Sequence, residues 1–352
     1  MRQLVIVSVT IAALFTTVSA SAHAQTPAAA AQVPAPGAQM PAPATPAQRP
    51  DAAREEWSTT QHSMRLDGRT IPYVAKAGTT AIRNEEGEIT GLMYSVSYTH
   101  GEAPGSNTRP VTFLFNGGPG SASMWLHMGS VGPKRVVTTN GEYTRPAPYP
   151  IVDNSETLLD RTDLVFIDAM GTGFSRIAGK GTEKDFYGVD GDANAFAQFI
   201  TTWLSRNGRW NSPKLIIGES YGTFRAAVVA NILQQRGVHL NGLNLLSMVL
   251  DLSTITFGAG DDRSYIVYLP SYAAVAWYHK VLPTQPASLE KWVDEARRYA
   301  VTDYAAALMK GSALPEAEMT AVAKRLSAFT GLSEDFLNAR VCGRRSASSM
   351  PN

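Results

Sequence analysis

One short apolar run, Leu215-Ile-Ile217, ends in the pentapeptide Gly218-Glu-Ser-Tyr-Gly222, which has the pattern Gly-x-Ser-x-Gly. In a nucleophile elbow, a buried strand turns so sharply into a helix that glycine is needed on either side of the serine, and the serine is held in a strained backbone conformation. Small and apolar side chains follow at residues 223–233, as is typical of a helix packed on a parallel sheet. These residues predict a strand at 214–217, a sharp turn, a helix and a nucleophile at Ser220.

Further apolar runs indicate that this strand belongs to a larger sheet. The runs at residues 111–115, 163–167 and 243–250 are short and continuous, which predicts buried parallel strands. Apolar residues from Phe196 onward recur at helical spacing up to Gly208, which predicts an amphipathic helix. This order of elements matches a doubly wound α/β sheet, in which the active loops follow the carboxyl ends of the strands.

The segments on either side of this sheet have different patterns. Before it, β-branched and aromatic residues alternate around the turn residues Asp67-Gly68 and Glu86-Gly87, which predicts antiparallel hairpins at residues 58–71, 72–82 and 89–100. After it, helical patterns occur at residues 272–280, 289–299, 304–310 and 316–329. We therefore expect a mixed, mostly parallel core over residues 57–252 and a helical cap insertion over residues 253–338.

Two glycine-rich loops follow the predicted strands. Asn116-Gly-Gly-Pro-Gly120 can form a plain tight turn, or it can present bare backbone N–H groups to a ligand. Its place ahead of the elbow favours the second interpretation, in which the N–H groups of Gly118 and Tyr221 form an oxyanion hole. The second loop, Gly171-x-Gly173, lacks the third glycine of a dinucleotide fingerprint, so we expect it to line a substrate cleft.

The amino terminus has the pattern of a secretory signal peptide. Arg2 precedes an apolar stretch at residues 4–18, and Ala22-His-Ala24 is a small-x-small cleavage site, so residues 1–24 would be removed after Ala24. The alternative, a membrane anchor, needs a longer apolar run of about 20 residues. Residues 25–56 are rich in Ala and Pro and predict a flexible linker. We expect a periplasmic or secreted protein with no stable membrane span after cleavage.

Charge and cysteine content exclude several classes of function. With 31 basic and 30 acidic residues, the net charge is +1, which gives no electrostatic basis for binding nucleic acid. Cys342 is the single cysteine, so an intramolecular disulfide is impossible and cysteine catalysis is disfavoured. We expect neither a cofactor nor a metal ion.

Four segments in order resemble a known family. They are Phe115-Asn-Gly-Gly-Pro-Gly-Ser-Ala-Ser123, Leu164-Val-Phe-Ile-Asp-Ala-Met-Gly-Thr-Gly-Phe-Ser175, Gly208-Arg-Trp-Asn-Ser-Pro213 and Gly218-Glu-Ser-Tyr-Gly222. Together they resemble the serine carboxypeptidases, peptidase family S10, which have an α/β-hydrolase fold, and the resemblance covers about residues 64–338. It implies an exported enzyme that releases C-terminal residues from peptides through an acyl-enzyme.

The resemblance also implies roles for individual residues. Ser220 is the nucleophile, with the oxyanion hole as above, while Asn116, Gly117 and Glu219 hold the free C-terminal carboxylate of a peptide substrate. A protonated glutamic acid can donate a hydrogen bond to such a carboxylate. Many members have a second glutamate near this site, where the present chain has Ser130.

The general base is harder to place. In this fold the Asp and the His follow the nucleophile, each after a later strand, but His239 lies in a polar connection and His279 in a predicted cap helix. Residues 339–352 have no apolar periodicity and form an aberrant tail. We therefore expect a truncated or frameshifted chain without the final strands, with an exposed apolar sheet edge and impaired catalysis.

Two other functions fit the same residues. The serine and its oxyanion hole would also support ester hydrolysis or acyl transfer. Without a base, Asn116 and Glu219 would instead suit a non-catalytic peptide-binding protein.

Overall fold

The computed structural model describes residues 53–100, 108–138, 146–249, 251–257 and 261–338. The predicted signal peptide, most of the linker and the predicted tail at 339–352 lie outside these residues. The chain divides into two compact units, Met1–Val249 and Leu250–Asn352, and each is described by itself. Among the described helices, none combines the length and the apolar composition needed to cross a bilayer.

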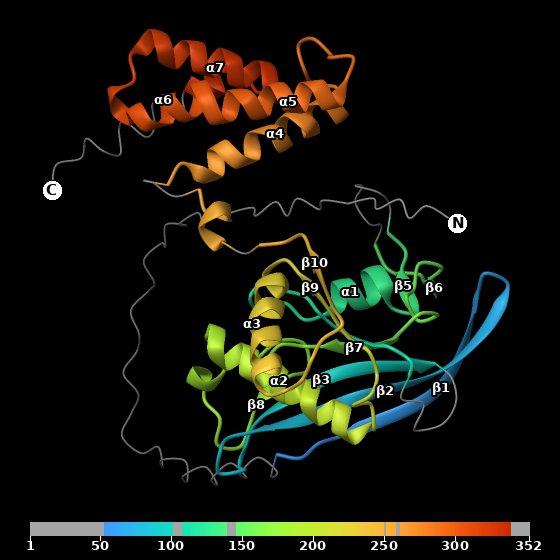
Figure 1. Ribbon diagram of the computed structural model, residues 1–352. Coiled ribbons are helices and arrows are strands. Elements are labelled where there is room, and N and C mark those ends of the chain that lie inside the picture. The colour runs from blue at the N-terminus through green and yellow to red at the C-terminus, as the bar shows by residue number, and fades with distance from the viewer. Residues whose placement is uncertain (1–52, 101–107, 139–145, 250, 258–260, 339–352) are drawn as a thin grey trace, which may run out of the picture. The chain divides into compact units, whose positions relative to one another are not determined.

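The first unit is built on an eight-stranded mixed sheet of order β1-β2-β3-β7-β4-β9-β10, with β8 paired to β3 (Figure 1). Its strands are β1 (Trp57–Leu66), β2 (Arg69–Arg83), β3 (Ile89–His100), β4 (Val111–Phe115), β7 (Asp163–Ile167), β8 (Arg176–Ile177), β9 (Lys214–Glu219) and β10 (Gly242–Leu246). A separate antiparallel pair consists of β5 (Lys134–Val136) and β6 (Ile151–Asp153). The helical elements are α1 (Met124–Leu126), η1 (His127–Val131), η2 (Glu183–Asp185), α2 (Val189–Arg206) and α3 (Tyr221–Gln235).

The amino-terminal strands form the antiparallel part of this sheet. β1 pairs with β2 around Asp67 and Gly68, whose φ angles are 50° and 76°. Two positive φ angles are typical of the tight hairpin turn that matches strand twist. The prediction of antiparallel hairpins is confirmed, although the second strand already begins at Arg69 because the two-residue turn leaves the residues after it paired with β1.

The parallel part of the sheet consists of β7, β4, β9 and β10. Phe113 and Phe115 point from β4 to one face of the sheet, where they pack on α2 and α3. Figure 1 shows both helices on this face. Leu114 points to the other face and packs with Leu164 of β7. Because both faces are covered here, all five residues of β4 are buried, which explains its continuous apolar run.

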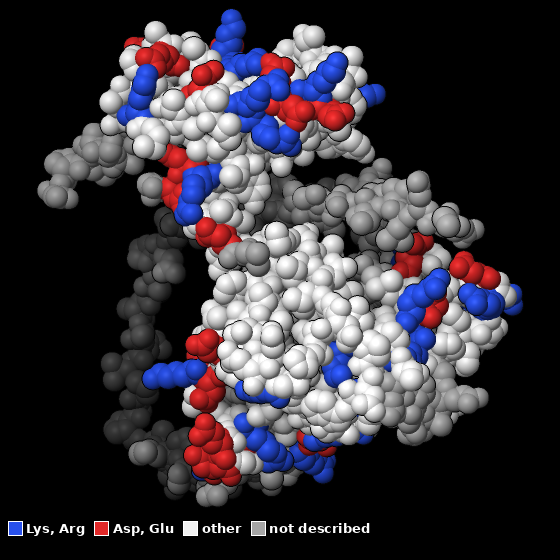
Figure 2. Space-filling view, viewed as in Figure 1, with Lys and Arg blue, Asp and Glu red and all other residues white. Residues whose placement is uncertain are grey.

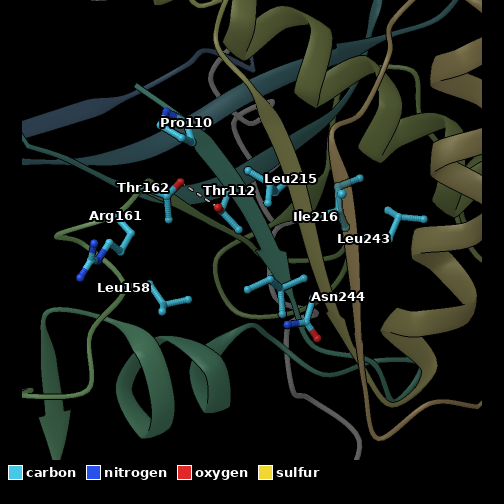
Figure 3. A pocket seen from close by; sticks show the side chains of 11 residues that line it. Pro110, Thr112, Leu158, Arg161, Thr162, Leu215, Ile216, Leu243 and Asn244 are labelled. Atoms are coloured by element: carbon cyan, nitrogen blue, oxygen red, sulfur yellow. Dashed lines mark hydrogen bonds between the residues drawn. The ribbon is translucent and has the colours of Figure 1, made fainter. Parts of the chain in front are cut away.

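The prediction that the last strand is buried is wrong in part. β10 ends at Leu246 and has β9 as its single neighbour in the described sheet, and Leu243 and Leu246 are 44% and 40% exposed. Beside it, a pocket of about 350 Å³ opens on the sheet. Figure 3 shows Leu215 and Asn244 among the residues that line it, together with Thr112 and Thr162, whose hydroxyl groups hydrogen-bond to each other. None of the predicted site residues lines this pocket.

A buried ion cluster holds the amino end of β7. Asp163 Oδ2 accepts a hydrogen bond from Arg209 Nη1 at 2.5 Å, and its Oδ1 accepts from Arg109 Nε at 2.8 Å and from the His100 N–H at 3.0 Å. Arg209 Nη2 also donates to the carbonyl of Arg109 at 2.6 Å. The Asp163 and Arg209 side chains are 2% and 9% exposed, so the two charges stabilise each other away from water.

The second unit is helical. Its elements are η3 (Leu252–Ile255), α4 (Arg263–Tyr278), α5 (Leu289–Tyr299), η4 (Ala300–Tyr304), α6 (Ala305–Lys310), η5 (Gly311–Ala313) and α7 (Glu316–Thr330). The predicted start of the first helix at residue 272 is wrong, since α4 begins at Arg263 and continues through Pro270. Leu269 and Ala273, one turn apart on α4, are both buried against Phe329 and its neighbours, and this packing offsets the missing hydrogen bond at the proline. The role of this unit as a cap stays a prediction.

Candidate active site

Ser220 lies in the turn between β9 and α3 with φ 56° and ψ −124°. A positive φ is strained for any residue with a side chain, at a cost of about 1–3 kcal/mol. Hydrogen bonds on both sides hold this conformation: the Ser220 N–H donates to the carbonyl of Leu246 at 2.9 Å, and Thr223 donates to the Ser220 carbonyl from its N–H and its hydroxyl. The turn therefore has the geometry of a nucleophile elbow.

The two glycines of the pattern are required by close backbone contacts. A Cβ at Gly218 would lie 2.1 Å from the carbonyl oxygen of Gly222, and one at Gly222 would lie 2.9 Å from that of Phe115. Both distances are shorter than a carbon and an oxygen atom tolerate, so the need for glycine here comes from close packing of the backbone.

The glycine loop after β4 lies directly against the elbow. β4 and β9 are parallel neighbours, with Phe115 opposite Gly218, so the loops after them leave the sheet side by side. A Cβ on Gly117 would lie 2.4 Å from the Tyr221 nitrogen. Gly118 is exposed with φ 106°, and the Tyr221 N–H is in the first turn of α3, where N–H groups have no helical acceptor. This arrangement is compatible with an oxyanion hole at Gly118 and Tyr221, which stays a prediction.

Asn116 and Glu219, which are 103 residues apart in the chain, are in direct contact. Asn116 Nδ2 donates to Glu219 Oε2 at 2.9 Å, while the Leu126 N–H donates to Asn116 Oδ1 at 3.1 Å. Because the Leu126 N–H needs an acceptor, the amide oxygen faces α1 and the amide nitrogen faces Glu219. Asn116 is 1% exposed and Gly117 is buried, whereas Glu219 and Ser220 are partly exposed. The structure thus brings the predicted site residues together in the glycine loop and in the adjacent turn from β9 to α3.

Asp168, which had no assigned role, connects the start of α1 to the loop after β7. Its Oδ1 accepts a hydrogen bond from the Ser123 N–H at 2.9 Å, and burial raises its pKa. A Cβ on Gly173 would lie 1.9 Å from Asp168 Oδ2, so this glycine makes room for the carboxylate. Nothing in the spacing of Gly171 and Gly173 could have identified this partner.

Large apolar side chains project from α1 and from the loop after β7. Met124 and Trp125, after the glycine loop, are 56% and 64% exposed, and Phe174, after β7, is 66% exposed. The visible face of the first unit has a broad area without charged side chains (Figure 2). Sequence reasoning missed these side chains, because a short apolar stretch does not by itself show whether its residues are buried or exposed.

His127 follows α1 and is stacked on Phe166, with ring centroids 4.5 Å apart, and its Nε2 lies 2.7 Å from the hydroxyl of Tyr98. Burial disfavours the charged ring and lowers the pKa of His127 to about 4. A histidine in the unfolded chain has a pKa of about 6.5, so the unfolded state binds the extra proton first as the pH falls.

Protonation of His127 is therefore expected to destabilise the fold in acid. The free energy of unfolding should be unaffected by this group above pH 6.5 and fall by about 2 kcal/mol between pH 6.5 and pH 4, allowing for partial exposure of the ring. Urea denaturation at pH 7 and pH 4.5 measures the difference. In a His127→Gln variant the difference should shrink by that amount, and an unchanged pH dependence would contradict the assignment to His127.

Among the described residues of the first unit, no histidine hydrogen-bonds to Ser220. His62, His100 and His127 contact Thr60, the carbonyl of Pro72 and Tyr98. His239 is exposed between α3 and β10, and His279 is exposed at the end of α4.

Comparison with known proteins adds the family. The family model described as serine carboxypeptidase matches residues 92–329. The chain is similar to the prohormone-processing carboxypeptidase Kex1 of Saccharomyces cerevisiae, at 20% identity and a TM-score of 0.43 over 73% of this chain and 53% of that one. It is also similar to the peroxisomal α/β-hydrolase Lpx1 of the same yeast, at 12% identity and a TM-score of 0.29 over 62% of this chain and 52% of that one.

A third solved structure, the juvenile hormone epoxide hydrolase of Bombyx mori, is 14% identical with a TM-score of 0.28 over 79% of this chain and 55% of that one. The chain thus spans about half the length of each of these structures. A search of curated proteins finds no match. Because the family model covers well over half of the sequence, and the mixed sheet, the elbow and the glycine loop agree with the predicted α/β-hydrolase fold, this chain belongs to the serine carboxypeptidase family.

Proposed function

We propose that this protein is an exported serine-type carboxypeptidase, or derives from one, and that its site recognises peptides with a free C-terminal carboxylate. The observation that carries the proposal is the pair Asn116 and Glu219, in contact at 2.9 Å and one residue from the strained Ser220. A nucleophile alone is common to many hydrolases, whereas a polar pair beside it suits a substrate whose carboxylate lies next to the bond that is cleaved.

In the proposed reaction, Ser220 Oγ attacks the carbonyl carbon of the last peptide bond. The N–H groups of Gly118 and Tyr221 stabilise the oxyanion, the C-terminal amino acid leaves with a proton on its new amine, and water then hydrolyses the acyl-serine ester. A base must take the serine proton in the first step. His239, which follows Ser220 within the first unit, is exposed between α3 and β10 and does not hydrogen-bond to Ser220, and on this observation we propose that acylation by the described residues is slow.

That last point favours a second candidate, a protein that binds peptides without cleaving them. The recognition elements do not depend on a base, so carboxylate binding would persist where turnover is lost. Export is supported by the pattern of residues 1–24, a positive start, an apolar stretch and a small-x-small site. A periplasmic or secreted location is proposed on that ground.

Calorimetric binding of a blocked peptide, as its free acid and as its amide, tests the proposal. We expect the free acid to bind about 10- to 100-fold more tightly, because charge-assisted hydrogen bonds contribute about 1.5–3 kcal/mol. A Glu219→Ala variant should lose most of this preference, while Glu183→Ala, an exposed glutamate on η2, should keep it. Equal affinity for acid and amide in the native protein would refute carboxylate recognition.

Release of the terminal amino acid from the same peptide then separates the candidates. Turnover that requires Ser220 supports the carboxypeptidase, and tight binding without turnover supports the binding protein. Faster cleavage of the matching ester, with no preference for a free carboxylate, would support an esterase or acyltransferase of this fold.

A further inference from the structure

Arg225 lies on α3, five residues after Ser220, and its side chain is 1% exposed. A buried guanidinium is costly unless its charge and its N–H groups are all accommodated. A cation near the amino end of a helix is also opposed by the helix dipole. These two unfavourable contributions must be offset by specific partners of the Arg225 side chain.

Those partners connect three elements beneath the predicted site. Arg225 Nε donates to Asp192 Oδ2 on α2 at 2.6 Å, and Nη1 donates to the carbonyl of Asn116 at 2.7 Å. The guanidinium also lies over the rings of Phe196 and Tyr221, at 4.6 and 5.2 Å from their centroids. One planar, forked side chain therefore fixes the distance from α2 and α3 to the end of β4.

The carbonyl of Asn116 is the important contact. The ladder between β4 and β9 ends at the pair Phe115 and Gly218, so the Asn116 carbonyl lies beyond the last paired residue of the strand. Arg225 supplies its donor, while the side chain of the same asparagine is held by Leu126 and Glu219. A shift of this carbonyl would move the Asn116 amide and the adjoining Gly117 together.

We propose that Arg225 is a positioning residue, which holds Asn116 and the glycine loop in register with Glu219 through the Asn116 carbonyl and is itself oriented by Asp192. This inference rests on the proposed carboxylate recognition, which it deepens. Arg225 does not touch the substrate, so its removal should affect the free acid of a peptide and leave the binding of the amide unchanged.

An Arg225→Lys variant tests the proposal. Lysine keeps the charge beside Asp192, but its single ammonium group cannot reproduce the fork that reaches Asn116 as well. We expect the affinity for the free-acid peptide to fall about tenfold, as for the loss of one buried hydrogen bond, with the affinity for the amide unchanged. Arg236→Lys is the matched control, because Arg236 also links α3 to α2, at Asn194, from an exposed position near the other end of the helix.

Hydrogen exchange followed by mass spectrometry gives a readout that does not depend on any ligand. In Arg225→Lys, amides of residues 116–126 should exchange about tenfold faster while the rest of the first unit keeps its rates. Asp192→Asn, which weakens the orientation of Arg225 but leaves the arginine in place, should give a smaller change in the same segment.

The outcomes are distinguishable. Unchanged exchange at residues 116–126 overturns the positioning role, whether or not the native protein binds peptides. Faster exchange throughout the unit, in proportion to a lower Tm, also overturns it, because that result describes a general structural role. If the native protein binds the free acid no better than the amide, the proposed function fails, and the local exchange still decides whether Arg225 positions the loop.

Discussion

Replacing Asp163 by alanine is expected to lower the free energy of unfolding by about 3–5 kcal/mol, a large fraction of the stability of a typical domain. The variant would leave Arg209, whose side chain is 9% exposed, without its carboxylate, and Arg109 would lose the same partner. The His100 N–H would lose its acceptor as well. Buried cations without a counter-charge are costly, and Asp163 is the carboxylate that pairs with both arginines in the native protein.

Chemical denaturation of the native protein and the variant measures this loss directly. Asp153→Ala is the control, since Asp153 pairs with Lys134 where both side chains are 42% exposed. An exposed ion pair contributes about 0–1 kcal/mol, so the control should unfold at nearly the native denaturant concentration. A loss at Asp163 as small as that at Asp153 would show that solvent reaches the cluster.

Replacing Gly117 by alanine is expected to abolish recognition in the site, with an affinity for the free-acid peptide about 100-fold lower. The new Cβ would lie 2.4 Å from the Tyr221 nitrogen, 2.6 Å from the Gly222 nitrogen and 2.7 Å from the Glu219 carbonyl. All three atoms are backbone, so the glycine loop and the elbow must move apart. That displacement separates Asn116 from Glu219 and withdraws Gly118 from Ser220.

A nearby glycine provides the control for this substitution. A Cβ added at Gly129 would enter open space, with no atom of the surrounding structure within 4 Å, and Gly129 has no positive φ. Gly129→Ala should therefore retain native binding. Thermal unfolding of both variants separates a local displacement from a failure to fold. Native affinity in Gly117→Ala would mean that the two loops are not held in contact.

The parts of this fold that sequence predicts best are those determined by neighbouring residues. The strands at 111–115 and 163–167 have the predicted bounds, because continuous apolar runs of that length are buried on both faces of a sheet. The elbow at Ser220 was equally predictable, since each of its two glycines lies two residues from the serine in the chain. By contrast, Pro270 does not end a helix here, since tertiary packing of α4 outweighs its local effect.

Contacts between distant residues could not be predicted in the same way. Arg225 and Asn116 are 109 residues apart, and Arg209 and Asp163 are 46 apart, with no local pattern that pairs them. The prediction for Asn116 and Glu219 came from the family resemblance. Their direct contact depends on the pairing of β4 with β9, which the sequence alone does not give. The exposure of β10 likewise depends on what lies beside it in the sheet.

Stability and chemistry impose opposite demands on residue 220. Glycine adopts φ 56° and ψ −124° without the steric conflict that a Cβ creates, so the serine is kept at a conformational cost in the folded state. Selection of variants for heat resistance alone would consequently favour replacing the side chain of the proposed nucleophile. A stabilised form of this protein should therefore be sought by substitutions elsewhere, with Ser220 held constant.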